Sequence, residues 1–279
     1  METKSTAEQL SDLAHQLSVR IQRAASHTQA LANEIDAWTA SDPIKLTPHI
    51  ASDRLSWELR VSVKPPALVE WSTHFDDAVH NLRAVLDNLV WGIAVLDGVT
   101  PRQPTKIQFP IVKERTKWKD EVERIAELPE PVRLAIESIQ PFQRTGLDGT
   151  PEQDALLLLN RLSNHEKHRL AIQPSLTPDE LAHSFGVEFR TDEEAEMNCP
   201  PTIEASADMF VDDAVLIRWA TKTPIVRVNG NASLKGRVVV EDEVVGLLGA
   251  TTVLAQLVEY VPQVMNIVLG NVSAVRSDG

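Results

Sequence analysis

The chain has 279 residues, of which 43% are hydrophobic and 24% are charged, and its formal net charge at pH 7 is −13. This apolar content is sufficient for the core of a soluble globular protein. The acidic excess argues against a protein that binds nucleic acid over much of its surface, because phosphate neutralisation requires clustered lysine and arginine. Nucleic acid is therefore an unfavoured partner, although a local basic groove would be compatible with it.

The single cysteine, Cys199, excludes an internal disulfide framework. The first residues lack the basic and then apolar pattern of a secretory signal peptide, so we expect a cytoplasmic protein. The sequence contains neither a glycine-rich phosphate loop nor a Gly-x-Ser-x-Gly nucleophile elbow. We therefore expect no cofactor.

The first predicted elements are a long helix and a strand. Apolar residues recur at helical spacing from residue 4 to residue 40, with no glycine or proline between them. The helix should end before Ser41-Asp42-Pro43, since a residue that precedes proline is disfavoured in a helix. From Leu55 to Val63 apolar and polar residues alternate, which predicts a half-buried strand that Pro65-Pro66 ends.

The next predicted helix, from residue 66 to about residue 96, has an apolar face and a polar stripe beside it. Asp76, His80, Arg83 and Asp87 form this stripe, because they follow one another at i, i+4, i+7 and i+11. Partly burying such groups costs free energy unless they pair. We therefore take the polar stripe as the first candidate for a functional site.

Four further helices are predicted, over residues 114–128, 130–139, 150–168 and 244–275. The last is apolar enough to raise the question of a membrane span. Polar residues interrupt it, and its apolar side chains form a stripe of three- and four-residue steps, so we expect a packing helix and no membrane.

The helix over residues 150–168 is rich in leucine and carries a second ionisable group of residues. Arg161, His165 and His168 share one face, because spacings of four and three residues return to nearly the same angle. We expect this helix to lie against the helix of the polar stripe. That arrangement would bring Arg83 and Asp87 close to Arg161 and His168.

Residues 169–243 have the composition of antiparallel β-structure. Short β-branched runs are separated by Asp, Asn, Gly and Pro, and Asn229-Gly230-Asn231 is typical of a hairpin turn. Part of this stretch is strongly acidic, which indicates a solvated surface. The strands are predicted at Phe185 to Arg190, Val215 to Trp219, Ile225 to Val228 and Arg237 to Glu241.

These elements together predict an α+β protein in which a helical bundle, with the long N-terminal helix, the central helices and the C-terminal helix, is combined with an antiparallel sheet. We expect a single domain over residues 1–279. Its helical core would cover about 4–168 and 244–272, and its β-rich segment about 169–243 would be joined by the strand at 54–64.

Five separated blocks of the sequence resemble a family of uncharacterised bacterial and phage-borne proteins. Asn88, Glu166 and Phe142 depart from its pattern, which has histidine, aspartate and tyrosine at these places. The resemblance implies a bacterial origin and supplies no activity. The blocks are Pro65-Pro66, the run HNLRAVLD from His80 to Asp87, Phe109-Pro110-Ile111, Gln140-Pro141-Phe142, and the run LSNHEKHR from Leu162 to Arg169.

Three hypotheses follow for these residues. The first is a structural or binding module, in which a buried network of His, Arg and Asp side chains fixes how two helices pack, with Arg83 paired to Asp87 or Asp76. Histidines near an apolar face are more often satisfied core groups than catalysts, so this hypothesis is favoured. The partner of such a module stays unknown.

The second hypothesis is a metal-independent ribonuclease. Arg161 and His168 are similar to the arginine and histidine pair of HEPN-type ribonucleases, a resemblance that implies an all-helical protein and a composite site across a homodimer. Histidine titrates near neutrality and arginine presents a planar fork to a phosphate. The catalytic candidates would be Arg161 and His168 together with Arg83 and Asp87.

The third hypothesis is a metal site between the two helices. Asp77 and His80 are three residues apart on one helix, and His165 and His168 are three apart on the other. Helical bundles bind metals through such pairs. Asn88 stands where the family pattern has histidine, so one further possible metal ligand is missing, and no metal is favoured.

Overall fold

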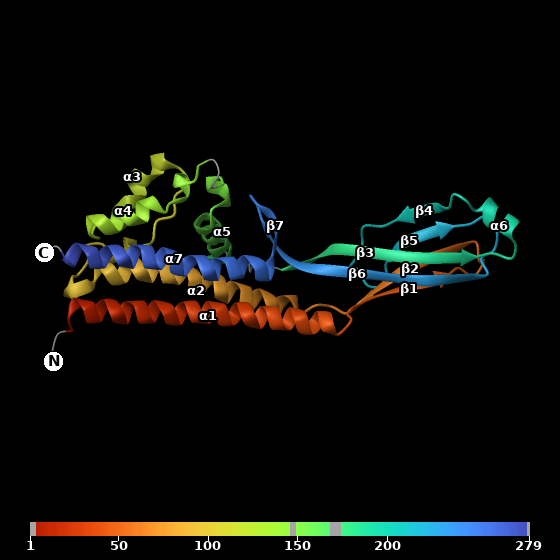
Figure 1. Cartoon of the computed structure of the whole chain (residues 1–279), viewed down its shortest axis with the longest axis horizontal. Coiled ribbons are helices and arrows are strands. Elements are labelled where there is room, and N and C mark those ends of the chain that lie inside the picture. The colour runs from red at the N-terminus through yellow and green to blue at the C-terminus, as the bar shows by residue number, and fades with distance from the viewer. Residues whose placement is uncertain (1–3, 146–148, 168–173, 278–279) are drawn as a thin grey trace. The chain divides into compact units, whose positions relative to one another are not determined.

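A computed structural model of the chain describes residues 4–145, 149–167 and 174–277 (Figure 1). It is an α+β protein, as predicted, with long helices and antiparallel strands. Contacts divide the chain into two compact units, which we call the helical unit and the β unit. The expectation of a single domain stays a prediction. The helical unit comprises Met1–Asn33, Val69–Pro174 and Val240–Gly279, and the β unit comprises Glu34–Leu68 and Ser175–Val239.

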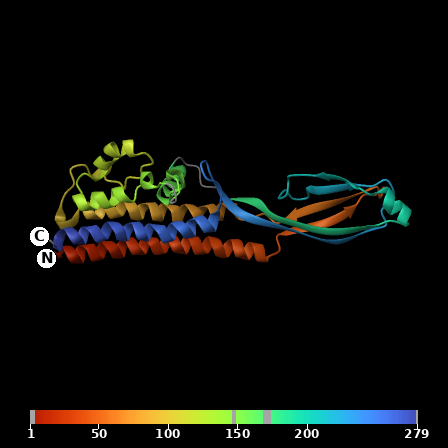
Figure 2. The ribbon, with the colours of Figure 1, turned by 45° about the horizontal axis from the view of Figure 1, so that its top comes forward.

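Three long helices form the main part of the helical unit. They are α1 (Thr6–Ala40), α2 (Leu68–Ala94) and α7 (Ala250–Ser277), and they run side by side in both views (Figures 1 and 2). The shorter helices α4 (Glu130–Ser138) and α5 (Ala155–Lys167) pack against α7. The predicted long helices at both ends of the chain are therefore confirmed.

The apolar face predicted for α2 is the centre of this unit's core. Phe75, Val79, Leu82, Leu86 and Val90 recur at helical spacing and are completely buried. Full burial of one such side chain contributes ~1.5–3 kcal/mol, so this face is a main source of stability. Leu13, Leu17, Ala24 and Leu31 of α1 are buried as well.

The helix predicted over residues 114–128 is wrong, because this segment is broken into three short pieces. These are a 3₁₀ turn η3 (Arg115–Lys117), a single helical turn α3 (Trp118–Glu121) and a second 3₁₀ turn η4 (Val122–Ile125). Only Trp118, Ile125 and Leu128 are buried here, so the helix has no continuous apolar stripe to bury. The remaining short 3₁₀ turns are η1 (Leu96–Gly98), η2 (Pro104–Lys106), η5 (Pro141–Gln143) and η7 (Pro151–Gln153).

The β unit contains an antiparallel four-stranded sheet in the order β1-β2-β5-β4. The predicted strand near residue 60 is β2, and β1 and β4 were not expected. Trp57 of β2 stacks on Trp219 of β5 at 3.9 Å between ring centroids. The bounds are β1 (Ile44–Ile50), β2 (Ser56–Val63), β4 (Thr202–Ala205) and β5 (Val215–Ala220).

A second sheet has the order β3-β6-β7, formed by β3 (Ser175–Glu188), β6 (Arg227–Asp242) and β7 (Gly246–Gly249). Phe185 of β3 packs edge-on against Trp57 at 4.9 Å between centroids, so an aromatic cluster joins the two sheets of the β unit. The short helix α6 (Asp192–Met197) lies in the acidic stretch, where no helix was predicted. Thr191 caps it by accepting a hydrogen bond from the Glu194 N–H.

The hairpin turn predicted at Asn229-Gly230-Asn231 is wrong, because these residues lie inside β6. They pair with β3 in register, Gly230 opposite Phe185. Long-range pairing with β3 therefore overrides the local turn preference. The glycine is still required, since its φ is 150° and a Cβ would lie 2.0 Å from the Ser184 carbonyl oxygen.

We expect Gly230→Ala to lower the free energy of unfolding by about 1–3 kcal/mol, because the added Cβ strains both the backbone and the pairing with β3. Gly186→Ala is the matched control in the same strand pair, where the nearest atom to a Cβ would be 3.9 Å away. Urea unfolding of the two variants measures the difference. Equal stability of both would contradict this assignment of the β6 register.

The C-terminal helix α7 is, among the described residues, the one helix long and apolar enough to cross a membrane, over Ala250–Val272. Its buried side chains recur at three- and four-residue steps, which is typical of a helix that packs in a core. Val244 and Leu247, which the predicted stripe included, lie before the helix and are exposed. The buried residues are Ala250, Val253, Leu254, Leu257, Val261, Val264, Met265, Val268 and Val272.

Candidate functional site

Two residues of the polar stripe hold a loop segment against α2. Arg83 and Asp87 form an ion pair, with Nη2 of Arg83 2.9 Å from Oδ1 of Asp87 and Nε 3.2 Å from Oδ2. Arg83 Nη2 also donates to the Phe109 carbonyl at 2.9 Å, and the Phe109 N–H donates to Asp87 Oδ1 at 2.9 Å. The pair therefore satisfies both backbone polar groups of Phe109, and we call this arrangement the Phe109 latch.

The latch is costly to bury, and its geometry compensates for that cost. Arg83 is 8% exposed, and burial lowers the pKa of its guanidinium, an effect that Asp87 opposes and Arg124 reinforces. Nη1 of Arg83 is buried without a hydrogen-bond partner among the described residues. A buried cation in this state depends on its one counter-ion, so Asp87 is indispensable to the latch.

A third side chain, that of Gln140, binds the backbone of the same segment. Gln140, which is completely buried, accepts a hydrogen bond from the Val112 N–H at 2.9 Å. Its Nε2 donates to the carbonyls of Pro110 and Ile136, at 3.0 and 3.1 Å. Three of the five blocks behind the family resemblance thus meet here. Side chains of the block from His80 to Asp87 and of the block Gln140-Pro141-Phe142 form hydrogen bonds with the backbone in and beside the block Phe109-Pro110-Ile111.

A cleft of about 590 Å³ opens beside the latched segment. Arg83 of α2 lines it together with Leu157, Asn160 and Asn164 of α5. Direct packing of α2 against α5 stays a prediction. At its rim Lys113 lies 2.9 Å from Glu152, and this hydrogen bond lowers the pKa of the Glu152 carboxyl to about 2. The remaining lining residues are Gln108, Phe109, Pro110, Ile111, Val112, Lys113, Lys117, Asp120, Glu121 and Arg124.

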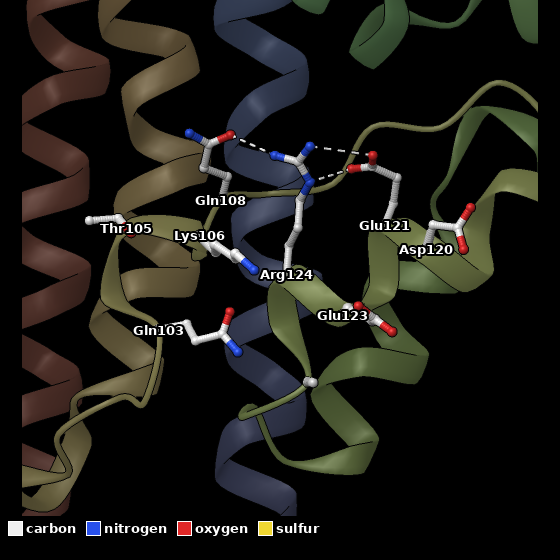
Figure 3. Close-up of a pocket in the computed structure, with 9 residues that line it drawn as sticks. Gln103, Thr105, Lys106, Gln108, Asp120, Glu121, Glu123 and Arg124 are labelled. Carbon is white, nitrogen blue, oxygen red and sulfur yellow. Dashed lines mark hydrogen bonds and ion pairs between the residues drawn. The ribbon is translucent and has the colours of Figure 1, made fainter.

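A side-chain bridge separates this cleft from a second one. Arg124 Nε lies 2.5 Å from Glu121 Oε2, and its Nη1 donates to Gln108 Oε1 at 3.0 Å (Figure 3). All three residues line both clefts. Asp120 also lines both clefts, and the second one, of about 610 Å³, has Glu123 in addition and fewer cationic side chains, so its lining is the more acidic.

Arg161 has a different position from the one expected. Its Nε donates to Asp242 Oδ2 at 2.7 Å, and Nη1 donates to the Glu152 carbonyl at 3.3 Å. Burial alone would raise the pKa of Asp242, but the hydrogen bonds from Arg161, Val245 N–H and Val244 N–H outweigh it and lower that pKa. Arg161 thus fixes the turn after β6 to α5, and it is not paired with Arg83 or Asp87.

The other predicted site residues are only partly described. His168, and the side chain of His165, lie outside the described residues. Asp77 is exposed and its Oδ2 lies 3.7 Å from Nδ1 of His27 on α1, while His80 is exposed. Within the described part of the chain, no three His, Cys, Asp or Glu side chains form a group that could hold a metal. The metal hypothesis, with two of its four ligands undescribed, stays a prediction.

Sequence reasoning missed two residues that matter most for this site. Gln140 carried a signal, because it opens the block before Pro141 that supports the family resemblance, yet a buried amide has no pattern of its own in one sequence. Asp242 carried none, since it lies among other acidic residues and its partner is 81 positions away in sequence.

No known protein family, no curated protein and no solved structure matches this chain. The resemblance to uncharacterised bacterial and phage proteins therefore stays a prediction, as does the similarity to HEPN-type ribonucleases. The class of protein is defined by its geometry alone: an α+β protein with a loop latched by buried polar side chains beside a polar cleft.

Proposed function

We propose that the protein is a non-catalytic binding module whose latched cleft accepts a small anionic ligand. The observation that carries this proposal is the use of Arg83, Asp87 and Arg161 in the fold itself. Each of them binds backbone groups and an opposite charge of the protein. A catalytic group must reach a substrate with a reactive atom, and these three are occupied in holding segments together.

The charge of the cleft supports an anionic ligand. Its lining includes four cationic side chains and two carboxylates, whereas the whole chain has a net charge of −13. Each of these four cations also has a carboxylate partner, so a small anion binds in the cleft by competing with those carboxylates. Asn160, Asn164 and Gln108 add amide donors that orient a phosphate or carboxylate.

The cations at the rim can exchange partners at little cost. Lys113 and Glu152 are 49% and 38% exposed, and Lys117 lies 3.9 Å from an exposed Glu114. Exposed pairs of this kind contribute only about 0–1 kcal/mol, so a ligand anion competes with them readily. Arg83, by contrast, is held in place by its bonds to Asp87 and Phe109 and would line the cleft without binding the ligand.

We propose in addition a cytoplasmic location, no membrane insertion and a homodimer as the assembly to test first. The free and exposed Cys199 fits a reducing compartment. The buried stripe of α7 supports a core helix over a membrane span. A bacterial source rests on the resemblance of the five blocks.

Titration calorimetry with inorganic phosphate tests the ligand class. We expect saturable binding that chloride at the same ionic strength does not reproduce, and at least about tenfold weaker binding by Lys113→Ala/Lys117→Ala. Lys45→Ala/Lys64→Ala, which removes two exposed lysines of the β unit, should bind as the parent does. Phosphate binding that the cleft variant retains in full would contradict the proposal.

Degradation of single-stranded RNA by the parent that His168→Ala abolishes, while its helix content is unchanged, would overturn the non-catalytic part and favour the ribonuclease hypothesis. Stoichiometric zinc, iron or manganese in the purified protein would instead favour the metal hypothesis.

A further inference from the structure

A groove of about 590 Å³ lies between α1 and α2, away from the latched cleft's lining residues. Its accessible apolar side chains include Val19 of α1 and Trp91 and Val95 of α2, while Leu13 and Leu17 of α1, which also line it, are buried. The two helices approach closely at Gly92, where a Cβ would lie 2.4 Å from Leu13 Cδ1. Trp91, the next residue to this contact, is 38% exposed.

The polar groups of the groove are all neutral or basic. His15, Arg20 and Arg23 line it from α1, and no carboxylate is among its lining residues. Arg20 and Arg23, three residues apart, lie on one side of the helix. Within the described part of the chain no acidic side chain forms an ion pair with either arginine. An apolar groove with two uncompensated guanidinium groups is unusual on a chain with a net charge of −13.

The shape of the groove favours a helix as its occupant. Two adjacent helices form a trough into which a third helix packs with its side chains, at an interaxial distance of ~8–10 Å. Amphipathic helices bind such troughs through apolar anchors at i, i+3, i+4 and i+7. A half-exposed tryptophan beside arginine is the kind of residue that contributes strongly to such an interface.

The charge distribution decides between occupants. Single-stranded nucleic acid carries one charge per nucleotide, and the groove offers only two permanent cations against the repulsion of the whole acidic chain. A symmetric dimer through this groove would bury Arg20 and Arg23 of both copies in an interface whose groove lining has no carboxylate to pair with them. An amphipathic helix with two or more carboxylates beside its apolar anchors fits the groove better. It needs only two cations, and each arginine can bind one carboxylate bidentately.

We propose that the α1–α2 groove docks an acidic amphipathic helix of a partner protein. Trp91, Val95 and Val19 receive its apolar anchors, and Arg20 and Arg23 bind carboxylates on its flank. This interaction surface is separate from the latched cleft and does not depend on an anionic ligand there.

The test uses a labelled peptide of ~16 residues, long enough to form a helix, with leucines at i, i+3, i+4 and i+7 and glutamates beside them. Fluorescence anisotropy should show saturable binding to the parent protein. Arg20→Glu/Arg23→Glu should bind at least about tenfold more weakly and should instead bind the same peptide with lysines in place of glutamates. Trp91→Ala should weaken binding of the acidic peptide by a similar factor.

The matched control is Lys64→Glu/Arg190→Glu, which reverses the same number of charges on exposed residues of the β unit and should leave binding unchanged. Circular dichroism establishes that each variant retains its helix content. The proposal is overturned if the acidic peptide binds the parent no better than the arginine variant. It is overturned equally if oligothymidylate binds at Arg20 and Arg23, or if Trp91→Ala abolishes a concentration-dependent dimer of the parent.

Discussion

Asp87→Leu is expected to lower the free energy of unfolding by ~3 kcal/mol, although the residue lies on a helix and its side chain is 30% exposed. The loss of stability comes from the groups that the substitution leaves without a partner. The buried guanidinium of Arg83 is left without its counter-ion, and the Phe109 N–H loses its acceptor. Arg83→Met should cost less, because the carboxylate of Asp87 can be hydrated once its partner is gone.

The double variant Arg83→Met/Asp87→Leu measures how strongly the two side chains of the latch depend on each other. It removes both charges, so no buried ion is left unpaired, and we expect a smaller loss than the two single variants predict when added. The coupling energy should be at least ~1 kcal/mol. Urea unfolding measures all four proteins, with the m-value as a check that the unfolded states are comparable.

An exposed ion pair provides the control for this cycle. Glu180 and Lys235 are closer together, at 2.6 Å, but are 55% and 67% exposed. Glu180→Leu/Lys235→Met should therefore change stability by no more than ~1 kcal/mol, because solvent screens the pair. If Asp87→Leu were as mild as this control, the polar stripe would have no structural role.

The elements that could be predicted are those whose burial follows one period along the chain. α1 and α2 bury a helical stripe, and β2 buries every second residue over much of its length. For such elements local pattern and tertiary environment agree, so a single sequence suffices. The same reasoning identified Asp87 as one of two expected partners of Arg83, the other being Asp76, because a spacing of four residues on a helix brings two side chains together.

The elements that were missed or predicted only in part are stabilised by partners distant in sequence. The strand predicted from Phe185 covers only the end of β3, because residues 175–184 are mostly exposed and show no alternation, and the full bounds of β3 follow from pairing with β6. The Asn229-Gly230-Asn231 sequence satisfies a turn locally, yet the register with β3 extends the strand through it. β1 contains Pro48 and lies at the edge of its sheet, where proline is tolerated. In the sequence alone, a proline argues against a strand, so β1 was not predicted.

In the candidate site, too, the local contacts could be predicted and the contacts between distant segments could not. The Arg83 and Asp87 pair is local, but its target, the backbone of Phe109, is 26 and 22 residues away, respectively. Arg161 was assigned to a shared site because it lies on the expected helix face. Its actual partner, Asp242, enters through a turn after β6 whose position only the tertiary structure determines.

Gln140→Leu should lower the free energy of unfolding by ~2–4 kcal/mol, although it exchanges a polar side chain for an apolar one of similar size in a fully buried position. The Val112 N–H and the Pro110 carbonyl would each lose a hydrogen-bond partner. A buried backbone group without a partner costs ~1–3 kcal/mol, which exceeds the gain from burying the leucine side chain.

Gln143→Leu is the matched control, since Gln143 follows on the same segment and is exposed, with one hydrogen bond from its Nε2 to the Glu137 carbonyl at 3.1 Å. Its stability should change by at most ~0.5 kcal/mol. Hydrogen exchange gives an independent readout, because the Val112 amide should lose protection in Gln140→Leu and keep it in Gln143→Leu. If Val112 stayed protected in Gln140→Leu, Gln140 would not be what holds this segment, and the cleft wall would depend on the Phe109 latch alone.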